Sequence, residues 1–200
     1  MIRSTIGRSA TVVFAAGCLC VDTCSAHGFS GAGWLHPLTG LDHALAMIAV
    51  GAWSAQLGGR AIFAVPLAFV VCMLLGGIAG FAAYPIAGTE LGIALSVQLL
   101  GLAIATGPRT VVLLAAAGVG IFGACHGYAH GREAPHSSGQ VSYAAGFLAT
   151  TAGLHIVGLM GGLLVLDEPR RAWMLRVAGA AVAAIGLYLV CRLLPTGATT

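Results

Sequence analysis

The sequence predicts an all-α protein: a polytopic membrane helix bundle with six transmembrane helices after a cleaved N-terminal signal peptide. Three observations support this fold class. Of the 200 residues, 58% are hydrophobic and only 8% are charged, whereas soluble chains carry about 25% charged residues. Apolar stretches of about 20 residues recur, each long enough to cross about 30 Å of hydrocarbon. Prolines at the edges of these stretches mark where helices begin or end.

The N-terminal segment has the pattern of a secretory signal peptide. Arg3 and Arg8 supply a positive region, a short apolar core follows, and small residues precede His27 as at a cleavage site. An uncleaved signal anchor is the alternative. We expect residues 1–26 to be removed and residues 27–200 to form a single transmembrane domain.

Six apolar segments follow the signal peptide, and each is expected to be helical. In hydrocarbon every backbone polar group needs a partner within the chain, which favours helices over extended segments. Pro66 lies inside one segment, where a kink is expected. The many glycines suit close helix–helix approach. The predicted helices cover residues 36–56, 61–83, 88–106, 110–130, 140–165 and 172–194.

The arginines predict the orientation of these helices. A cleaved signal peptide leaves the mature N-terminus outside the cytoplasm. Six spans then place Arg132 and Arg192 outside and a larger group inside, in agreement with the positive-inside rule. The inner group is Arg60, Arg109, Arg170, Arg171 and Arg176. The net charge of +3 is small and its arginines are scattered, which argues against nucleic-acid binding.

A first polar cluster opens the first predicted span. His36 and His43 are seven residues apart, which places them two turns apart on one helical face. Asp42 could bind a metal ion itself or fix the tautomer of a neighbouring imidazole. Pro37 suits a first helical turn. His27, as the mature N-terminal residue, would add an amine and an imidazole for a metal ion.

A second cluster closes the fourth predicted span. His126 and His130 share a helical face, and Glu133 follows three residues later, so two imidazoles and a carboxylate can surround one ion. Glu90 lies near the outer start of the third span. His155 lies midway along the fifth span, where a hydrogen-bonded structural histidine is the more common role and a deeper ion station is the alternative.

The predicted topology brings both clusters to the same face of the membrane. Ionisable groups near hydrocarbon are costly and therefore indicate function. The alternative is polar bonding that only holds the helices together. Imidazole and carboxylate ligands suit nickel, zinc, cobalt and copper(II), and affinity alone does not choose among these ions.

Three stretches resemble the HupE/UreJ family: HPLTGLDHALAMIAVG at 36–51, HGYAHGRE at 126–133 and GFLATTAGLHIVG at 146–158. The resemblance implies a nickel permease of the bacterial inner membrane that serves hydrogenase or urease maturation and passes the ion without ATP. It also implies an important aromatic position at Phe69. The family's important polar positions fall here on His36, Asp42, His43, Glu90, His130 and Glu133.

We therefore expect a transporter and not an enzyme, with Ni²⁺ as cargo and with Co²⁺ or Zn²⁺ as other ions it could carry. No permanently bound cofactor is expected. The expected partners are the divalent ion and the lipid bilayer, and a homo-oligomer is compatible with the sequence. The alternatives are an intramembrane zinc hydrolase, against which the absence of HExxH counts, and a di-haem electron carrier.

Overall fold

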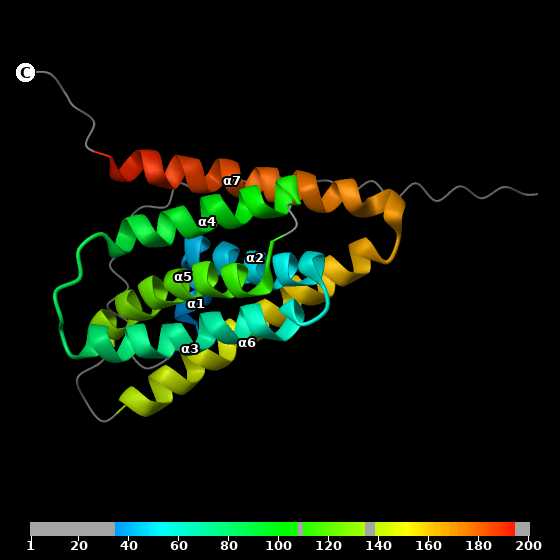
Figure 1. The fold of residues 1–200 in the computed structure, drawn as a ribbon. Coiled ribbons are helices and arrows are strands. Elements are labelled where there is room, and N and C mark those ends of the chain that lie inside the picture. Colours follow the sequence, from blue (N-terminus) through cyan, green and yellow to red (C-terminus); the bar gives the residue numbers. More distant parts are fainter. Residues whose placement is uncertain (1–34, 108–109, 135–138, 195–200) are drawn as a thin grey trace, which may run out of the picture.

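The computed structural model describes residues 35–107, 110–134 and 139–194, and within these ranges the chain is all-helical (Figure 1). The predicted fold class is confirmed at this level. The signal peptide, His27 and Arg109 lie outside the described residues. The helices are α1 (His36–Thr39), α2 (Leu41–Leu57), α3 (Ala61–Phe81), α4 (Thr89–Thr106), α5 (Val112–Glu133), α6 (Gln140–Leu166) and α7 (Ala172–Leu193), with a 3₁₀ turn at Pro169–Arg171 before α7.

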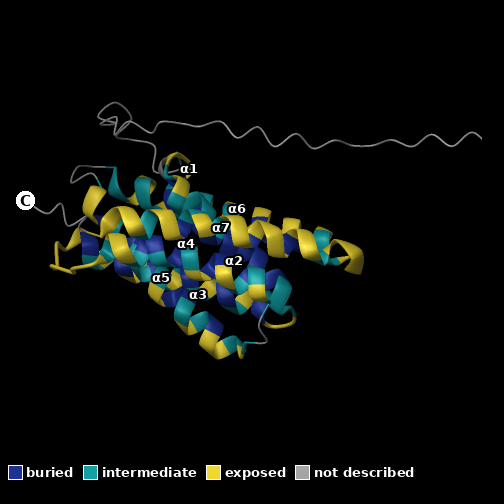
Figure 2. Cartoon of the chain, turned by 90° about the horizontal axis from the view of Figure 1, so that it is seen from above, coloured by how far each residue is buried: buried dark blue, intermediate teal, exposed yellow. Residues whose placement is uncertain are grey.

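The length and apolar character of these helices indicate a multi-pass membrane protein. Among the described residues, five helices are long and apolar enough to cross a membrane, namely α3 to α7. Many of their large apolar side chains are exposed, such as Leu67, Ile156 and Leu187, as expected for surfaces that face lipid. The shorter helix α2 has 17 residues and is buried over most of its length, and Figure 2 shows the buried segments gathered around it.

The expected continuous helix over 36–56 is wrong. The chain leaves the helical conformation at Gly40, where φ is −87° and ψ is 108°, so α1 and α2 are separate. His36 and His43 therefore belong to different helices, and the predicted two-turn spacing along one helix does not apply to them. A β-carbon at Gly40 would lie 3.1 Å from both the Asp42 Oδ1 and the His43 Nδ1. Glycine thus leaves space for the polar pair that begins α2. Pro37 lies in the first turn of α1, as predicted.

The helices pack in three extensive pairs, α3 with α5, α2 with α6, and α4 with α7 (Figure 1). The first two pairs are parallel and the third is antiparallel, as the order of their glycine contacts shows. In α5, Gly123 contacts the Phe69 carbonyl and Gly127 contacts the Met73 carbonyl. Small residues of this kind let helix backbones approach closely in a membrane.

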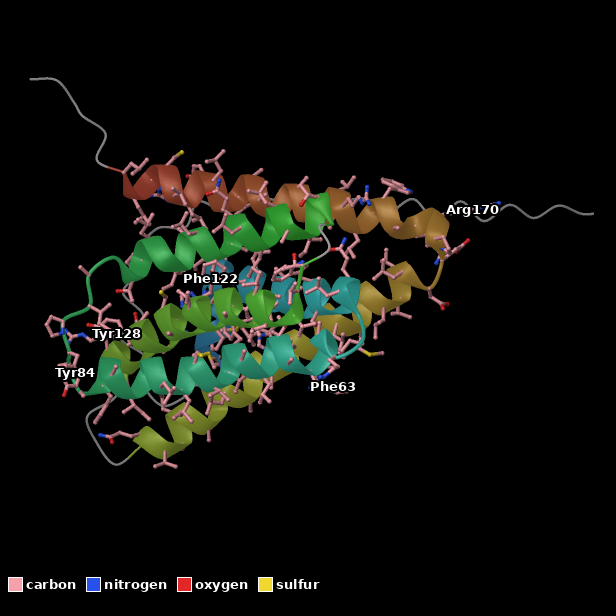
Figure 3. All side chains as sticks on the ribbon, in the orientation of Figure 1. Phe63, Tyr84, Phe122, Tyr128 and Arg170 are labelled. Carbon is pink, nitrogen blue, oxygen red and sulfur yellow. The ribbon has the colours of Figure 1, made fainter. Side chains whose placement is uncertain are left out.

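This pairing places elements that are distant in sequence at one end of the bundle. The start of α2 lies with the end of α5, because His43 contacts His126 and His130. The end of α3 and the loop before α4 lie there too. The Tyr128 hydroxyl donates to the Tyr84 carbonyl and accepts from the Ile86 N–H, and Figure 3 shows Tyr84 and Tyr128 together at that end.

Candidate metal-binding site

Three imidazoles from two helices meet inside the bundle. His43 near the start of α2 makes edge contacts with His126 and His130 of α5, with ring centroids 4.6 Å apart in both pairs. His126 is completely buried and His130 is 2% exposed. The helical spacing that predicted a shared face for His126 and His130 is confirmed by their common contact with His43. These side chains point into the bundle and not toward lipid.

A carboxylate fixes the proton of the first imidazole. The Asp42 Oδ1 accepts from the backbone N–H of His43 and lies 2.8 Å from the His43 Nδ1. An ionised carboxylate only accepts hydrogen bonds, so the Nδ1 carries the proton and the Nε2 carries a lone pair. The Nε2 is buried and has no hydrogen-bond partner among the described residues. Asp42 thus presents the His43 Nε2 as a ligand.

A serine determines which ring nitrogen carries the proton in the second imidazole, that of His126. The Ser96 hydroxyl of α4 donates its one proton to the Ile93 carbonyl at 2.6 Å, and it lies 3.0 Å from the His126 Nε2. The Nε2 must therefore donate to the hydroxyl oxygen, which leaves the lone pair on the Nδ1. This Nδ1 is buried and lacks a hydrogen-bond partner within the described part of the chain.

Two imidazole lone pairs thus remain unsatisfied in a water-poor interior. An unsatisfied buried polar atom costs about 1–3 kcal/mol, and a neutral imidazole nitrogen with a free lone pair is the form that binds a metal ion. Within the described residues, no three His, Cys, Asp or Glu side chains are placed so that they could hold one metal ion together.

Phe69 of α3 lies between these imidazoles and a further histidine. Its ring centroid is 5.5 Å from that of His126 and 5.1 Å from that of His155 in α6. His155 is 3% exposed, and neither of its ring nitrogens has a hydrogen-bond partner among the described residues. The described residues therefore supply no hydrogen bond for the structural role that the sequence favoured for His155, and its role as a deeper ion station stays a prediction.

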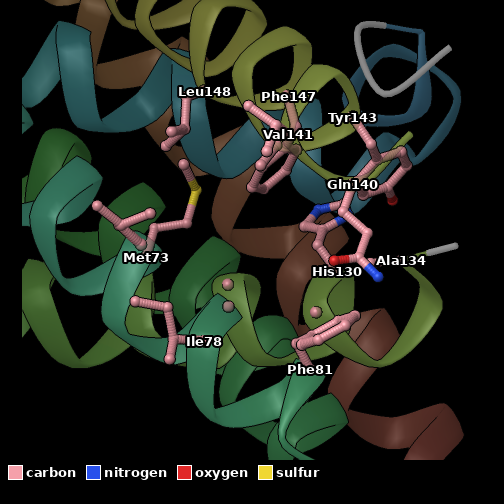
Figure 4. A pocket seen from close by; sticks show the side chains of 15 residues that line it. Met73, Ile78, Phe81, His130, Ala134, Gln140, Val141, Tyr143, Phe147 and Leu148 are labelled. Carbon is pink, nitrogen blue, oxygen red and sulfur yellow. The ribbon is translucent and has the colours of Figure 1, made fainter. Parts of the chain in front are cut away.

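An apolar cavity at the side of the bundle reaches one of the imidazoles, that of His130. A cavity of about 270 Å³ lies between α3 and the first half of α6, and Figure 4 shows His130 in its wall near Tyr143 and Ala134. The His130 ring also packs on Phe147, with centroids 3.9 Å apart. The remaining lining is mostly apolar, from residues such as Met73, Ile78 and Phe81.

Comparison with known proteins identifies the family of this chain. The model of the family described as HupE / UreJ protein matches residues 10–189. This chain belongs to the HupE/UreJ family. A curated relative, Protein HupE of Rhizobium leguminosarum bv. viciae, is 44% identical over 160 residues, which cover 80% of this chain and 83% of the relative. No solved structure matches the chain.

The structure of this HupE/UreJ protein brings together only part of the predicted site. Asp42, His43, His126, His130 and His155 lie in or next to the buried cluster. Two predicted carboxylate residues, Glu90 in the first turn of α4 and Glu133 at the end of α5, are exposed. His36 begins α1, but its side chain and the whole of His27 lie outside the described residues.

Ser96 of this HupE/UreJ chain is not among the site residues predicted from the sequence. Its hydroxyl is the only one between Leu91 and Ala105 of α4, and this isolation in an apolar segment was a usable signal. The sequence could not identify its partner, because His126 is 30 residues away on another helix. Helical periodicity describes one helix and says nothing about which helix packs beside it.

Proposed function

We propose that this protein is a permease for Ni²⁺ or a closely related divalent ion such as Co²⁺ or Zn²⁺. The observation that carries the proposal is the pair of orphaned lone pairs on the His43 Nε2 and the His126 Nδ1. Neutral imidazole nitrogens are ligands for late first-row metals. The half-buried Asp42 carboxylate would offset part of the ion's charge more strongly than it could in bulk water.

The proposed path runs from the periplasm to the cytoplasm. His27, His36, Glu90 and Glu133 gather ions at the outer end, and the ion then binds at His43, His126 and His130 beside Asp42. It next passes Phe69 toward His155. The path requires α2 to cross the membrane in addition to the five longer helices. Its 17 residues meet the lower limit of about 17 for a spanning helix.

The proposed driving force is the membrane potential and not ATP. A potential that is negative inside favours cation entry by about 2.3 kcal/mol per charge for each 100 mV. In this proposal the protein lies in the bacterial inner membrane with its mature N-terminus in the periplasm. It supplies nickel for the maturation of hydrogenase or urease and catalyses no covalent reaction.

Uptake into liposomes tests the proposal. Purified protein is reconstituted into vesicles that contain a nickel-sensitive dye, and Ni²⁺ is added outside without ATP. We expect saturable uptake that accelerates when a potassium gradient with valinomycin makes the interior negative. We expect His43→Gln to reduce the rate by about 10–100-fold, because the Nε2 ligand is lost. Uptake no faster than in protein-free vesicles would overturn the permease proposal.

Ser96 provides a prediction about binding that does not need transport. Ser96→Ala removes the acceptor that holds the His126 tautomer, so we expect the dissociation constant for Ni²⁺ to rise by about 10–100-fold. Titration calorimetry of the detergent-solubilised protein measures this change. Ser54→Ala is the matched control, because Ser54 is also fully buried but its hydroxyl bonds only the Gly51 carbonyl. Equal affinities for the two variants would contradict the role of Ser96.

A further inference from the structure

The hydroxyl of Thr151 in α6 has unusual partners. It is fully buried and lies 3.3 Å from the Met47 Sδ of α2 and 3.8 Å from the Met73 Sδ of α3. A hydroxyl inside a helix ordinarily donates to a backbone carbonyl one turn earlier. Several other hydroxyls in the described helices do so, for example those of Ser54, Ser96 and Thr106. The side chain of Thr151 instead points to two thioethers.

His155 completes this polar group in an otherwise apolar interior. It follows Thr151 by one turn on the same face of α6, and its ring nitrogens have no hydrogen-bond partner among the described residues. Its ring contacts Phe69, which precedes Met73 by one turn on α3. Gly51, one turn after Met47 on α2, contacts the His155 carbonyl. The three helices therefore bring these side chains to one junction.

The separations at this junction suit ligands of a single ion. Taking zinc as the reference ion, oxygen ligands bind at about 2.1 Å and sulfur ligands at about 2.3 Å. With about 90–110° between them, the two donor atoms lie about 3.1–3.6 Å apart. The distance of 3.3 Å from the Thr151 hydroxyl to the Met47 sulfur falls within this interval. The distance of 3.8 Å to the Met73 sulfur is slightly longer than the interval, and a small change of the Met73 rotamer would shorten it.

We propose that Met47, Met73, Thr151 and His155 form a second, inner ion station that accepts nickel-like ions and rejects harder ones. Thioether and imidazole ligands favour late transition metals, whereas Mg²⁺ and Mn²⁺ prefer carboxylate, carbonyl and water oxygens. All four side chains are nearly or fully buried, so an ion that enters must exchange water for these ligands. Phe69 separates this station from the outer imidazoles. The inference rests on the proposed permease function.

Transport selectivity tests the station. Met47→Leu and Met73→Leu are combined in one variant, because leucine conserves the volume of methionine and is tolerated in packed cores. We expect Ni²⁺ uptake to fall by about tenfold and the ratio of Ni²⁺ to Mn²⁺ uptake to fall with it. The control combines Met160→Leu and Met174→Leu, since both methionines are exposed on the bundle surface. An unchanged ratio of Ni²⁺ to Mn²⁺ uptake in the variant that combines Met47→Leu and Met73→Leu would overturn the inner ion station.

X-ray absorption at the nickel edge supplies a readout that does not depend on transport. The sample is full-length His43→Gln protein loaded with Ni²⁺, in which the outer imidazoles bind weakly. We expect a sulfur scatterer at about 2.3–2.4 Å that disappears when the two methionines are also replaced. A spectrum without a sulfur scatterer overturns the inner ion station even if the wild-type protein transports nickel. Sulfur ligation in a protein that carries no nickel would overturn the permease and support the station.

Discussion

Replacing Asp42 with asparagine will reduce nickel uptake by about 10–100-fold and will leave the yield of folded protein unchanged. The asparagine oxygen can still accept from the His43 backbone N–H and from the His43 Nδ1, as the Asp42 Oδ1 does at 2.8 Å. The substitution therefore keeps the shape of the pair and removes its negative charge. Dye-loaded vesicles with equal amounts of reconstituted protein measure the rate.

The loss should reflect the charge of the transported ion. A dication in a low-dielectric interior interacts far more strongly with a nearby carboxylate than the same charges would in water. Because the asparagine retains the hydrogen bonds, a role limited to holding α2 in place predicts near-normal uptake. A large loss of uptake with an unchanged thermal midpoint therefore identifies the carboxylate as part of the ion's environment.

Asp167→Asn is the matched control for this change. Asp167 follows the last residue of α6, at the end of the bundle opposite to Asp42. The same loss of one negative charge there should change uptake less than twofold, because exposed or distant charges are screened by salt within about 10 Å. Similar losses in both variants would show a general effect of protein charge and would contradict a specific role for Asp42.

The sequence was sufficient to predict the helices and the end of the bundle that holds the polar cluster. Apolar length and proline position set most helix bounds, so α6 and α7 agree with the prediction to within one residue at each end. The alternation of spans predicted that the start of α2 and the end of α5 meet. His43 lies against His126 and His130 for this reason.

The sequence was not sufficient where the outcome depends on which helices are neighbours. The α3–α5 and α2–α6 pairs join helices that are not consecutive in the chain, and no spacing rule selects such pairs. The contacts of Ser96 with His126 and of Thr151 with the two methionine sulfurs follow from that choice. The break at Gly40 was missed because an isolated glycine is tolerated inside helices at a cost of about 1 kcal/mol.

The closest helix contact yields the second large prediction. We expect Gly127→Ala to destabilise the protein by about 1–3 kcal/mol and to reduce nickel uptake with it. A β-carbon at Gly127 would overlap the Met73 carbonyl of α3, so α3 and α5 would have to separate. Gly127 lies between His126 and His130, and both rings would move relative to His43. Thermal unfolding in detergent, followed by circular dichroism, measures the change in stability.

Gly118→Ala in the same helix separates this clash from the general effect of replacing a helical glycine. A β-carbon at Gly118 would meet no atom of another helix within 4 Å. Alanine is favoured over glycine in a helix by up to about 1 kcal/mol, so this variant should be as stable as the wild type or more stable. If Gly127→Ala were equally stable, the α3–α5 contact would have to be looser than the structure shows. The shared position of His126 and His130 against His43 would then lose its support, because that position depends on how closely α5 packs within the bundle.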